Sequence, residues 1–521
     1  MADSDNTTSE YEMGSDNIRP FGLDIHNPVF LVSAGVIILF VIFALAFQET
    51  SAEFFGWLRP KLTSEFDWFL VIAVDIMLIF CLVLIVLPVG KVRIGGKDAK
   101  PDYSYPAWIA MLFAAGIGIG LLFFGVLEPV YYNYAEGGGA WPLGIDPASP
   151  GNEYIGIVGT VHHWGLGGWA VYAVVGLSLA VFCYNKKLPL TLRSAFYPIL
   201  GEKVWKWPGH VIDTLAVFAT LFGLTTSLGL GAKQIAAGLS DVFGIAPSDT
   251  LIVGLIVLIT LVALGSVVMG MDKGVKRLSE INMVVAILLF FFVFFISGAV
   301  DALTRYFGVM VDYVKLLVPL SNPVGREDTS FFHGWTTFYW AWWIAWSPFV
   351  GMFIARISKG RTVREFILCV LIAPTLVCAL WMSTFGGAAI DMINSGAGEG
   401  LNAVIVDSYK PELALFRLLD QYPLYSIVAP ICLVLIIIFF VTSSDSGSLV
   451  IDTITAGGKM NAPVVQRVFW CTLEGLVAIA LLLGGGLAAL QGAAVSTGIP
   501  FTIVVLLMCY TVYKALNTEE K

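Results

Sequence analysis

The chain has 521 residues, of which 58% are hydrophobic and only 13% are charged. A soluble protein carries about 25% charged residues, so this composition excludes a soluble globular protein and indicates an integral membrane protein. The net charge of −9 gives no sign of nucleic-acid binding, and the seven cysteines lack paired or metal-ligand spacing, which argues against disulfides and zinc.

The first 27 residues are polar and acidic, unlike a signal peptide, which begins basic and continues apolar. We expect residues 1–27 to form a short disordered tail. Apolar runs of about 20 residues then recur, each long enough to cross a bilayer as a helix. About twelve spans are predicted, near Pro28–Phe47, Trp68–Val89, Pro106–Phe124, Tyr154–Tyr184, Val211–Leu239, Thr250–Met271, Ile281–Phe307, Trp335–Ile357, Phe366–Ile390, Tyr425–Val441, Val465–Gly484 and Thr497–Tyr513.

The loops between these spans alternate in charge. Basic residues such as Lys91 and Arg93 follow the even-numbered spans, whereas acids such as Glu128 and Glu153 gather on the other side. The positive-inside rule then places the basic loops, and both termini, in the cytoplasm.

The third span contains glycine at positions 116, 118 and 120. Each glycine weakens a helix by about 1 kcal/mol, and unwound backbone in lipid is tolerated only where it lines a cavity. The pattern indicates an interrupted helix, whose free N–H groups near Ala115 and Gly116 would hold a carboxylate while nearby carbonyls hold a cation. Close helix packing through a Gly-x-x-x-Gly motif is the alternative.

The fourth span contains a second aromatic group. Trp169 and Tyr172 are three residues apart and share a helix face, and Trp164 completes a three-ring cluster if the helix bends at the glycines between them. The cluster indicates either a cage for a cation or an aromatic belt at the membrane surface.

The segment before the eighth span, Thr304–Leu317, is too polar to cross the membrane. It suits an amphipathic helix at the outer surface or against another subunit.

The eighth span holds Trp340, Trp342, Trp343 and Trp346 within seven residues, followed by Ser347-Pro348, which predicts an interruption of the helix. Indole faces attract a quaternary ammonium by roughly 0.5–2 kcal/mol per ring. The cluster therefore suits a cage for a cation that has no N–H to donate, with a bulky packing interface as the alternative.

The tenth span ends in the hydroxyl-rich segment Thr442–Ser448. Hydroxyl oxygens are ligands that hard cations such as sodium prefer. Capping of the helix by the same hydroxyls is the alternative.

The third and eighth spans are five apart. If spans three to seven and eight to twelve form two halves, the odd number turns the halves in opposite directions across the membrane. Interrupted helices at matching places of inverted repeats predict a binding site halfway through the membrane in a secondary transporter.

Together these motifs resemble the betaine/carnitine/choline transporter family over about Pro28–Tyr513. The segments that carry the resemblance are Ala114–Gly120, His163–Trp164 with Trp169 and Tyr172, Phe338–Trp343 with Trp346–Phe349, Ala355–Arg361, and Thr442–Ser448.

The resemblance implies an all-α integral membrane protein with about 12 transmembrane helices. It implies a leucine-transporter-like 5+5 inverted repeat preceded by two extra helices, assembled as a homotrimer. The expected boundaries are a tail (1–27), two N-terminal peripheral helices and a loop (28–104), the first repeat (105–307), an amphipathic linker helix and outer loop (308–333), the second repeat (334–513) and a short cytoplasmic tail (514–521).

For the substrate, the resemblance implies a cage around the trimethylammonium group and backbone contacts to the carboxylate. The cage residues would be Trp164, Trp169, Tyr172 and Trp343, with Trp342 and Trp346 along the inward path, Trp340 nearby, and Ala115 and Gly116 at the carboxylate. Members that prefer choline tend to carry Asp at the position of Gly120, so the glycine favours glycine betaine.

For sodium, the resemblance implies one site between the backbone at Ala114 and Ile117 and the hydroxyls of Thr442 and Ser443. A second family site uses two hydroxyls one turn apart on the fifth span together with an aromatic face. Thr220 and Phe349 match it, but the second hydroxyl position is occupied by Leu224. Sodium-independent carnitine exchangers carry Arg where this chain has Met283.

We therefore expect a sodium-coupled importer of a quaternary ammonium or sulfonium compatible solute, with glycine betaine favoured, in the plasma (bacterial inner) membrane. The alternatives are proton-coupled choline or betaine uptake and a sodium-independent carnitine/betaine exchanger. An enzyme is disfavoured because the five histidines form no metal or triad pattern. No catalytic residue, no nucleic-acid partner and no cofactor other than the coupling ion is expected.

Overall fold

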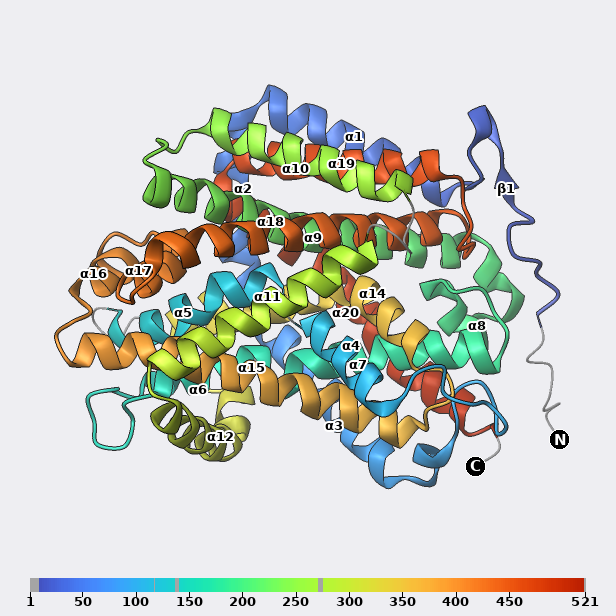
Figure 1. Cartoon of the computed structure of the whole chain (residues 1–521). Coiled ribbons are helices and arrows are strands. Elements are labelled where there is room, and N and C mark those ends of the chain that lie inside the picture. The colour runs from blue at the N-terminus through green and yellow to red at the C-terminus, as the bar shows by residue number, and fades with distance from the viewer. Residues whose placement is uncertain (1–8, 117, 136–139, 270–274, 520–521) are drawn as a thin grey trace.

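A computed structural model describes residues 9–116, 118–135, 140–269 and 275–519. These residues are almost entirely helical, as the composition predicts, and most of the long helices lie side by side along one direction (Figure 1). The helices are α1 (Val29–Ala46), α2 (Gln48–Glu65), α3 (Asp67–Val86), α4 (Tyr105–Gly116), α5 (Ile119–Tyr134), α6 (Ile155–Trp164), α7 (Leu166–Ala180), α8 (Tyr197–Leu200), α9 (Trp207–Phe243), α10 (Asp249–Met269), α11 (Val275–Ile296), α12 (Ala299–Ser321), α13 (Thr329–Phe331), α14 (Thr337–Ile357), α15 (Val363–Asn394), α16 (Glu399–Asn402), α17 (Ala414–Asp420), α18 (Tyr425–Thr455), α19 (Val464–Leu483) and α20 (Gly486–Leu516).

Within these described residues, ten helical segments are long and apolar enough to cross a membrane. They are α1, α3, the α6–α7 segment, α9, α10, α11, α15, α18, α19 and α20. The remaining two predicted spans correspond to the α4–α5 pair, which is divided into two short helices, and to α14, which is rich in tryptophan. The chain is thus a multi-pass membrane protein.

The helices differ in how deeply they lie inside the protein. Over an apolar stretch of 18 residues in each segment, 89% of the residues of α6–α7 and 83% of those of α9 are buried, against only 33% in α10 and 22% in α11. Large apolar side chains such as Leu39 on α1 and Leu258 on α10 point outward. In a membrane protein such a surface faces lipid. The tryptophan-rich α14 packs against α7, α9 and α20 and therefore lies at the centre.

The seventh span ends earlier than the sequence suggested. Helix α11 stops at Ile296, and the chain turns at Gly298, whose φ of 94° lies in a region that glycine adopts without strain. Helix α12 then begins at Ala299, so the amphipathic helix expected over Thr304–Leu317 is the middle of a longer element. In Figure 1, α12 lies at the edge of the bundle.

The interruption predicted in the eighth span is absent, because α14 continues through Pro348 as one helix. Proline lacks the N–H that would bond the carbonyl four residues earlier, which here belongs to Ile344. The hydroxyl of Ser347 donates to this same carbonyl at 2.7 Å. The serine therefore replaces the missing backbone bond and allows the helix to continue.

Residues 9–27, expected as part of a disordered tail, form an N-terminal strap across the end of the bundle where both termini lie (Figure 1). A short antiparallel pair joins β1 (Asn17–Ile18) to β2 (Ile25–His26). The Asn17 amide donates to the carbonyl of Ala456 at 2.9 Å, and Lys459 pairs with Asp24 at 2.8 Å.

The other part of the strap reaches the loop before α9. The ring of Tyr11 stacks on Trp205 with a centroid separation of 4.3 Å, and the guanidinium of Arg193 lies against both rings. Arg193 is fully buried and forms an ion pair with Asp213 at 3.2 Å. The strap thus connects the end of α18 to the start of α9, and these local polar contacts give it an ordered structure despite its acidic composition.

Candidate functional site

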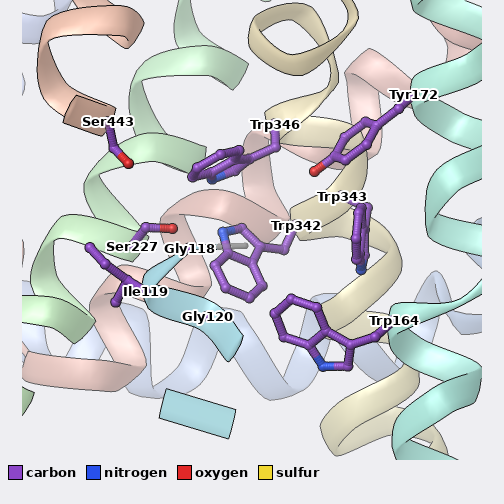
Figure 2. A pocket seen from close by; sticks show the side chains of 10 residues that line it. All are labelled: Gly118, Ile119, Gly120, Trp164, Tyr172, Ser227, Trp342, Trp343, Trp346 and Ser443. Carbon is purple, nitrogen blue, oxygen red and sulfur yellow. The ribbon is translucent and has the colours of Figure 1, made fainter. Parts of the chain in front are cut away.

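A cavity lies among the central helices (Figure 2). Its walls come from α5, α6, α7, α9, α14 and α18, which are far apart in the sequence. The residues that line it are Gly118, Ile119, Gly120, Trp164, Tyr172, Ser227, Trp342, Trp343, Trp346 and Ser443.

Two helix breaks shape this cavity. Helix α4 ends at Gly116 and α5 begins at Ile119, and Gly118 between them has extended backbone, in agreement with the predicted interruption of the third span. Helix α6 ends at Trp164 and α7 begins at Leu166, so the fourth span also bends. The bend is at Gly165, one of the glycines where the sequence allowed it.

The second break is stabilised by two side chains. The carbonyl of Trp164 accepts a hydrogen bond from the Trp169 indole N–H at 3.2 Å. The backbone N–H of Leu166 donates to the hydroxyl of Tyr313 on α12 at 3.1 Å. These contacts satisfy backbone groups that the break removes from the helix, and they place the Trp164 ring at the cavity wall.

The aromatic rings meet around Trp343, as Figure 2 shows. The centroid of the Trp343 ring lies 5.7 Å from that of Trp164 and 4.8 Å from that of Tyr172. Trp342 lies 6.4 Å from Trp164 and is nearly perpendicular to it. Indole and phenol faces from α6, α7 and α14 therefore converge on one cavity, and we call Trp164, Tyr172 and Trp343 the aromatic cage.

Two of the predicted aromatic residues do not line the cavity. Trp169 is fully buried behind the cage, with its centroid 5.4 Å from Tyr172 and 5.6 Å from Trp343. Trp340 faces a different side of α14, where its ring contacts His162. Trp169 supports the cage from behind, whereas Trp340 packs between helices.

The carbonyl of Gly223 on α9 holds the other two tryptophans. It accepts hydrogen bonds from the indole N–H groups of Trp342 at 3.2 Å and of Trp346 at 2.6 Å. A Cβ at Gly223 would lie only 2.7 Å from the Trp346 ring, so the glycine permits this close approach. The two indoles border the cavity on the side toward Ser443 (Figure 2).

The buried carboxyl group of Glu128 anchors the cage through a hydrogen bond from Trp164. Glu128 accepts hydrogen bonds from the Trp164 indole N–H at 2.9 Å, from the Tyr132 hydroxyl at 2.8 Å and from the Tyr339 hydroxyl. His163 Nδ1 lies 3.2 Å from the same carboxyl group. The loop assignment of Glu128 from the charge pattern was wrong, because this residue is fully buried within α5, where several donors compensate its desolvation.

The residues proposed to meet the substrate carboxylate lie at the first break. Only the backbone of Ala115 and Gly116, in the last turn of α4, belongs to the described part of the chain, together with that of Ala114. Ile117 lies outside the described residues. Gly118 and Gly120, directly beyond it, line the cavity.

The predicted sodium ligands occupy two places. Ser443 lines the cavity, whereas the neighbouring Thr442 hydroxyl donates back to the carbonyl of Ile438 at 2.9 Å. On α9 the Thr220 hydroxyl donates to the carbonyl of Ala216 at 2.7 Å. The Phe349 ring packs on Trp346 at 5.2 Å.

Leu224, one turn after Thr220, packs against α18. Its Cδ2 atom would lie 2.2 Å from a Cβ placed at Gly447. An apolar side chain therefore fills the position where the resemblance implies a second hydroxyl.

Sequence reasoning missed Ser227 and Glu128. Ser227 lies seven residues after Thr220 and thus on the same face of α9, which would have placed its hydroxyl near the cavity. Nothing in the sequence separates Glu128 from the loop acids near it. The lining residues that the structure describes include two serines and five aromatic side chains, but no charged side chain.

Comparisons with known proteins agree with this geometry. The profile of the BCCT family, described as betaine/carnitine/choline family transporters, matches residues 28–521. A glycine betaine/proline/choline transporter of Vibrio parahaemolyticus is 52% identical over 533 residues, covering 98% of this chain and 95% of the relative. Glycine betaine transporter 1 of the same organism is 52% identical over 519 residues, covering 99% and 98%. A glycine betaine transporter of Acinetobacter baylyi is 40% identical over 499 residues, covering 95% and 74%.

Proposed function

The chain belongs to the betaine/carnitine/choline transporter family, whose members are transporters and not enzymes, and from this premise we propose that it imports glycine betaine together with sodium. The observation that carries the proposal is the convergence of Trp164, Tyr172 and Trp343 on one cavity. Each ring face supplies roughly 0.5–2 kcal/mol of attraction for a quaternary ammonium group.

The choice of a zwitterion over a simple cation rests on the charge of the cavity. The described lining has no acidic side chain that would neutralise choline. Glycine betaine brings its own carboxylate, which backbone N–H groups at the break between α4 and α5 would bind, since free N–H groups at a helix terminus attract anions. The relatives whose names include glycine betaine support the same choice.

One sodium ion is proposed near Ser443 and Thr442 on α18, with backbone carbonyls at Ala114 and Ile117 as further ligands. Support comes from Ser443, which lines the same cavity as Gly118 and Gly120 beside the first break (Figure 2). A second ion at Thr220 and Phe349 is disfavoured because Leu224 offers no oxygen. We therefore propose a simple, non-sigmoidal dependence of uptake on sodium.

The architecture proposed for this cycle is the leucine-transporter-like inverted repeat, with repeats at 105–307 and 334–513. The α4–α5 pair and α14 would open the two repeats, and both contribute to the cavity. We further propose a homotrimer in the bacterial inner membrane, with both termini in the cytoplasm. The exposed apolar residues Phe307, Val311 and Val314 on α12 offer a surface for subunit contact.

The test is uptake of radiolabelled glycine betaine into proteoliposomes. An inward sodium gradient is expected to drive accumulation, and Ser443→Ala is expected to reduce it. Equal accumulation driven by a proton gradient without sodium would support proton coupling instead. Uptake that requires vesicles preloaded with substrate would support the exchanger.

A further inference from the structure

The N-terminal strap contains an apolar turn that nothing in the described chain covers. The hairpin between β1 and β2 turns at Pro20–Gly22, and the side chain of Phe21 at its tip is fully exposed. The φ of Phe21 is 52°, in a region that a bulky residue rarely adopts. The turn thus directs an aromatic ring away from the protein, and neither packing nor the substrate cavity accounts for it.

The tip of the hairpin differs in composition from the rest of the strap. Residues 18–23 read Ile-Arg-Pro-Phe-Gly-Leu and contain no acid. The other strap acids precede the hairpin, at Glu10, Glu12 and Asp16. A segment that combines exposed apolar side chains with a basic one is typical of a membrane surface.

The charge of Arg19, next to the tip, is available for a partner outside the chain. Its side chain is 75% exposed and lies 3.9 Å from the carboxylate of Asp24. That carboxylate already accepts hydrogen bonds from Lys459 and Asn17, both at 2.8 Å. Asp24 therefore does not depend on Arg19, and the guanidinium faces solvent or whatever covers the tip.

The hairpin lies beside a surface that faces lipid. Strand β2 ends at His26, and α1, which is long and apolar enough to span a membrane, begins at Val29. Leu31 and Val32 in the first turn of α1 are exposed. Figure 1 shows the hairpin at the rim of the bundle, next to the ends of α1 and α19. The tip is thus at the level where the lipid-facing surface of α1 begins.

The start of α19 continues the same surface. Gln466 accepts a hydrogen bond from the backbone N–H of Asp24 at 3.2 Å, which fixes the hairpin beside α19. Val464 and Val465, directly before Gln466, are exposed. Exposed apolar residues of the tip, of α1 and of α19 therefore share the rim of one end of the bundle. In a membrane protein, lipid covers an apolar surface of this kind.

We propose that the tip of the strap is a membrane anchor, in which Phe21 lies in the headgroup region of the adjacent leaflet and Arg19 binds lipid phosphate. Contact with lipid removes the Phe21 ring from water, and anionic headgroups attract a cationic side chain at the surface. Because the strap also connects the end of α18 to the start of α9, the anchor ties both helices to the bilayer. The inference does not depend on which solute the protein transports.

Spin labelling tests the anchor in the full-length protein, in nanodiscs of phosphatidylethanolamine and phosphatidylglycerol. A nitroxide is attached to Phe21→Cys, and its accessibility to oxygen, which concentrates in lipid, is compared with its accessibility to a water-soluble nickel chelate. We expect the label to favour oxygen, as a label on the outward-facing control Ile42→Cys of α1 does. The exposed control Glu12→Cys, in the acidic part of the strap, is expected to favour the nickel chelate. Wild type measures the background, because its cysteines are buried or half-buried.

Two results would overturn the proposal. One is a label on Phe21→Cys that is as accessible to the nickel chelate as the label on Glu12→Cys. The other is a label shielded from both reagents, which would indicate that another copy of the chain covers the tip. In the Phe21→Cys protein, Arg19→Gln is expected to lower the ratio of oxygen to nickel accessibility about two-fold, because the attraction to anionic headgroups is lost. An unchanged ratio would contradict the contact of Arg19 with lipid phosphate.

Discussion

Gly120 on α5 and Trp164 on α6 approach each other so closely that a Cβ at Gly120 would lie 2.5 Å from Cη2 of the indole. The Trp164 ring is also held at its polar edge, because its indole N–H donates to Glu128 at 2.9 Å. The ring therefore cannot move away from a larger side chain without losing this hydrogen bond. Position 120 controls the cage through the placement of Trp164.

Gly120→Ala is expected to displace the Trp164 ring and to weaken glycine betaine binding about 10-fold, which corresponds to about 1.4 kcal/mol. Gly35→Ala on α1, outside the cavity, is the matched control, because a Cβ there meets no atom within 4 Å. Equilibrium binding of radiolabelled betaine measures both. Equal affinity in the two variants would show that the Gly120–Trp164 contact does not shape the site.

Glu128→Gln keeps the size of the side chain but replaces one acceptor oxygen by an N–H₂ group that faces donors. The Trp164 and Tyr339 groups then lose a shared acceptor, and leaving a buried donor without its partner costs about 1–3 kcal/mol. We expect betaine affinity to fall at least 10-fold, with Glu53→Gln as the exposed control. Unchanged affinity would leave Glu128 with a structural role alone.

The helical class and the site were predictable from the sequence to different degrees. Runs of about 20 apolar residues sufficed for the spans, because each must satisfy its own backbone in lipid. The convergence of Trp164, Tyr172 and Trp343 followed from family motifs. The continuous course of α14 could not be predicted from the sequence. Pro348 indicated a break, and the hydrogen bond that compensates for the proline depends on the rotamer of Ser347.

Ser347→Ala is expected to leave the carbonyl of Ile344 without a donor and to lower stability by about 1 kcal/mol. Ser178→Ala is a matched control, since its hydroxyl is equally buried but has no partner in the described chain. Thermal unfolding in detergent compares the two. A larger loss in Ser178→Ala than in Ser347→Ala would contradict the role assigned to the Ser347 hydroxyl.

Long-range contacts account for the other residues that the sequence misplaced. Glu128 resembled a loop acid because its partners Trp164 and Tyr339 are distant in the chain. The strap resembled a disordered tail because its order depends on Arg193 and Lys459, far along the sequence. Charge and hydropathy patterns describe neighbours along the chain and therefore do not contain these pairings.

The strap is expected to loosen at acidic pH. Partial burial alone would raise the pKa of Asp24, but hydrogen bonds from Lys459 and Asn17 hold that pKa below its ordinary value. The stabilisation is therefore present above the unfolded pKa of about 4 and is lost as pH falls through the lower folded pKa. Hydrogen exchange of residues 9–27 should increase in that range.

Asp24→Asn is expected to raise the same exchange already at neutral pH, whereas the exposed control Asp102→Asn should not. Slow exchange at neutral pH in Asp24→Asn would show that other contacts hold the strap.

The direct test of the cage is the affinity of Trp343→Leu for glycine betaine, measured by equilibrium binding of the radiolabelled solute. Trp343 contacts both other cage rings, so its loss is expected to weaken binding about 10-fold or more, while the outward-facing Trp68→Leu binds as wild type does. Wild-type affinity in Trp343→Leu would contradict recognition of a methylated cation by these rings.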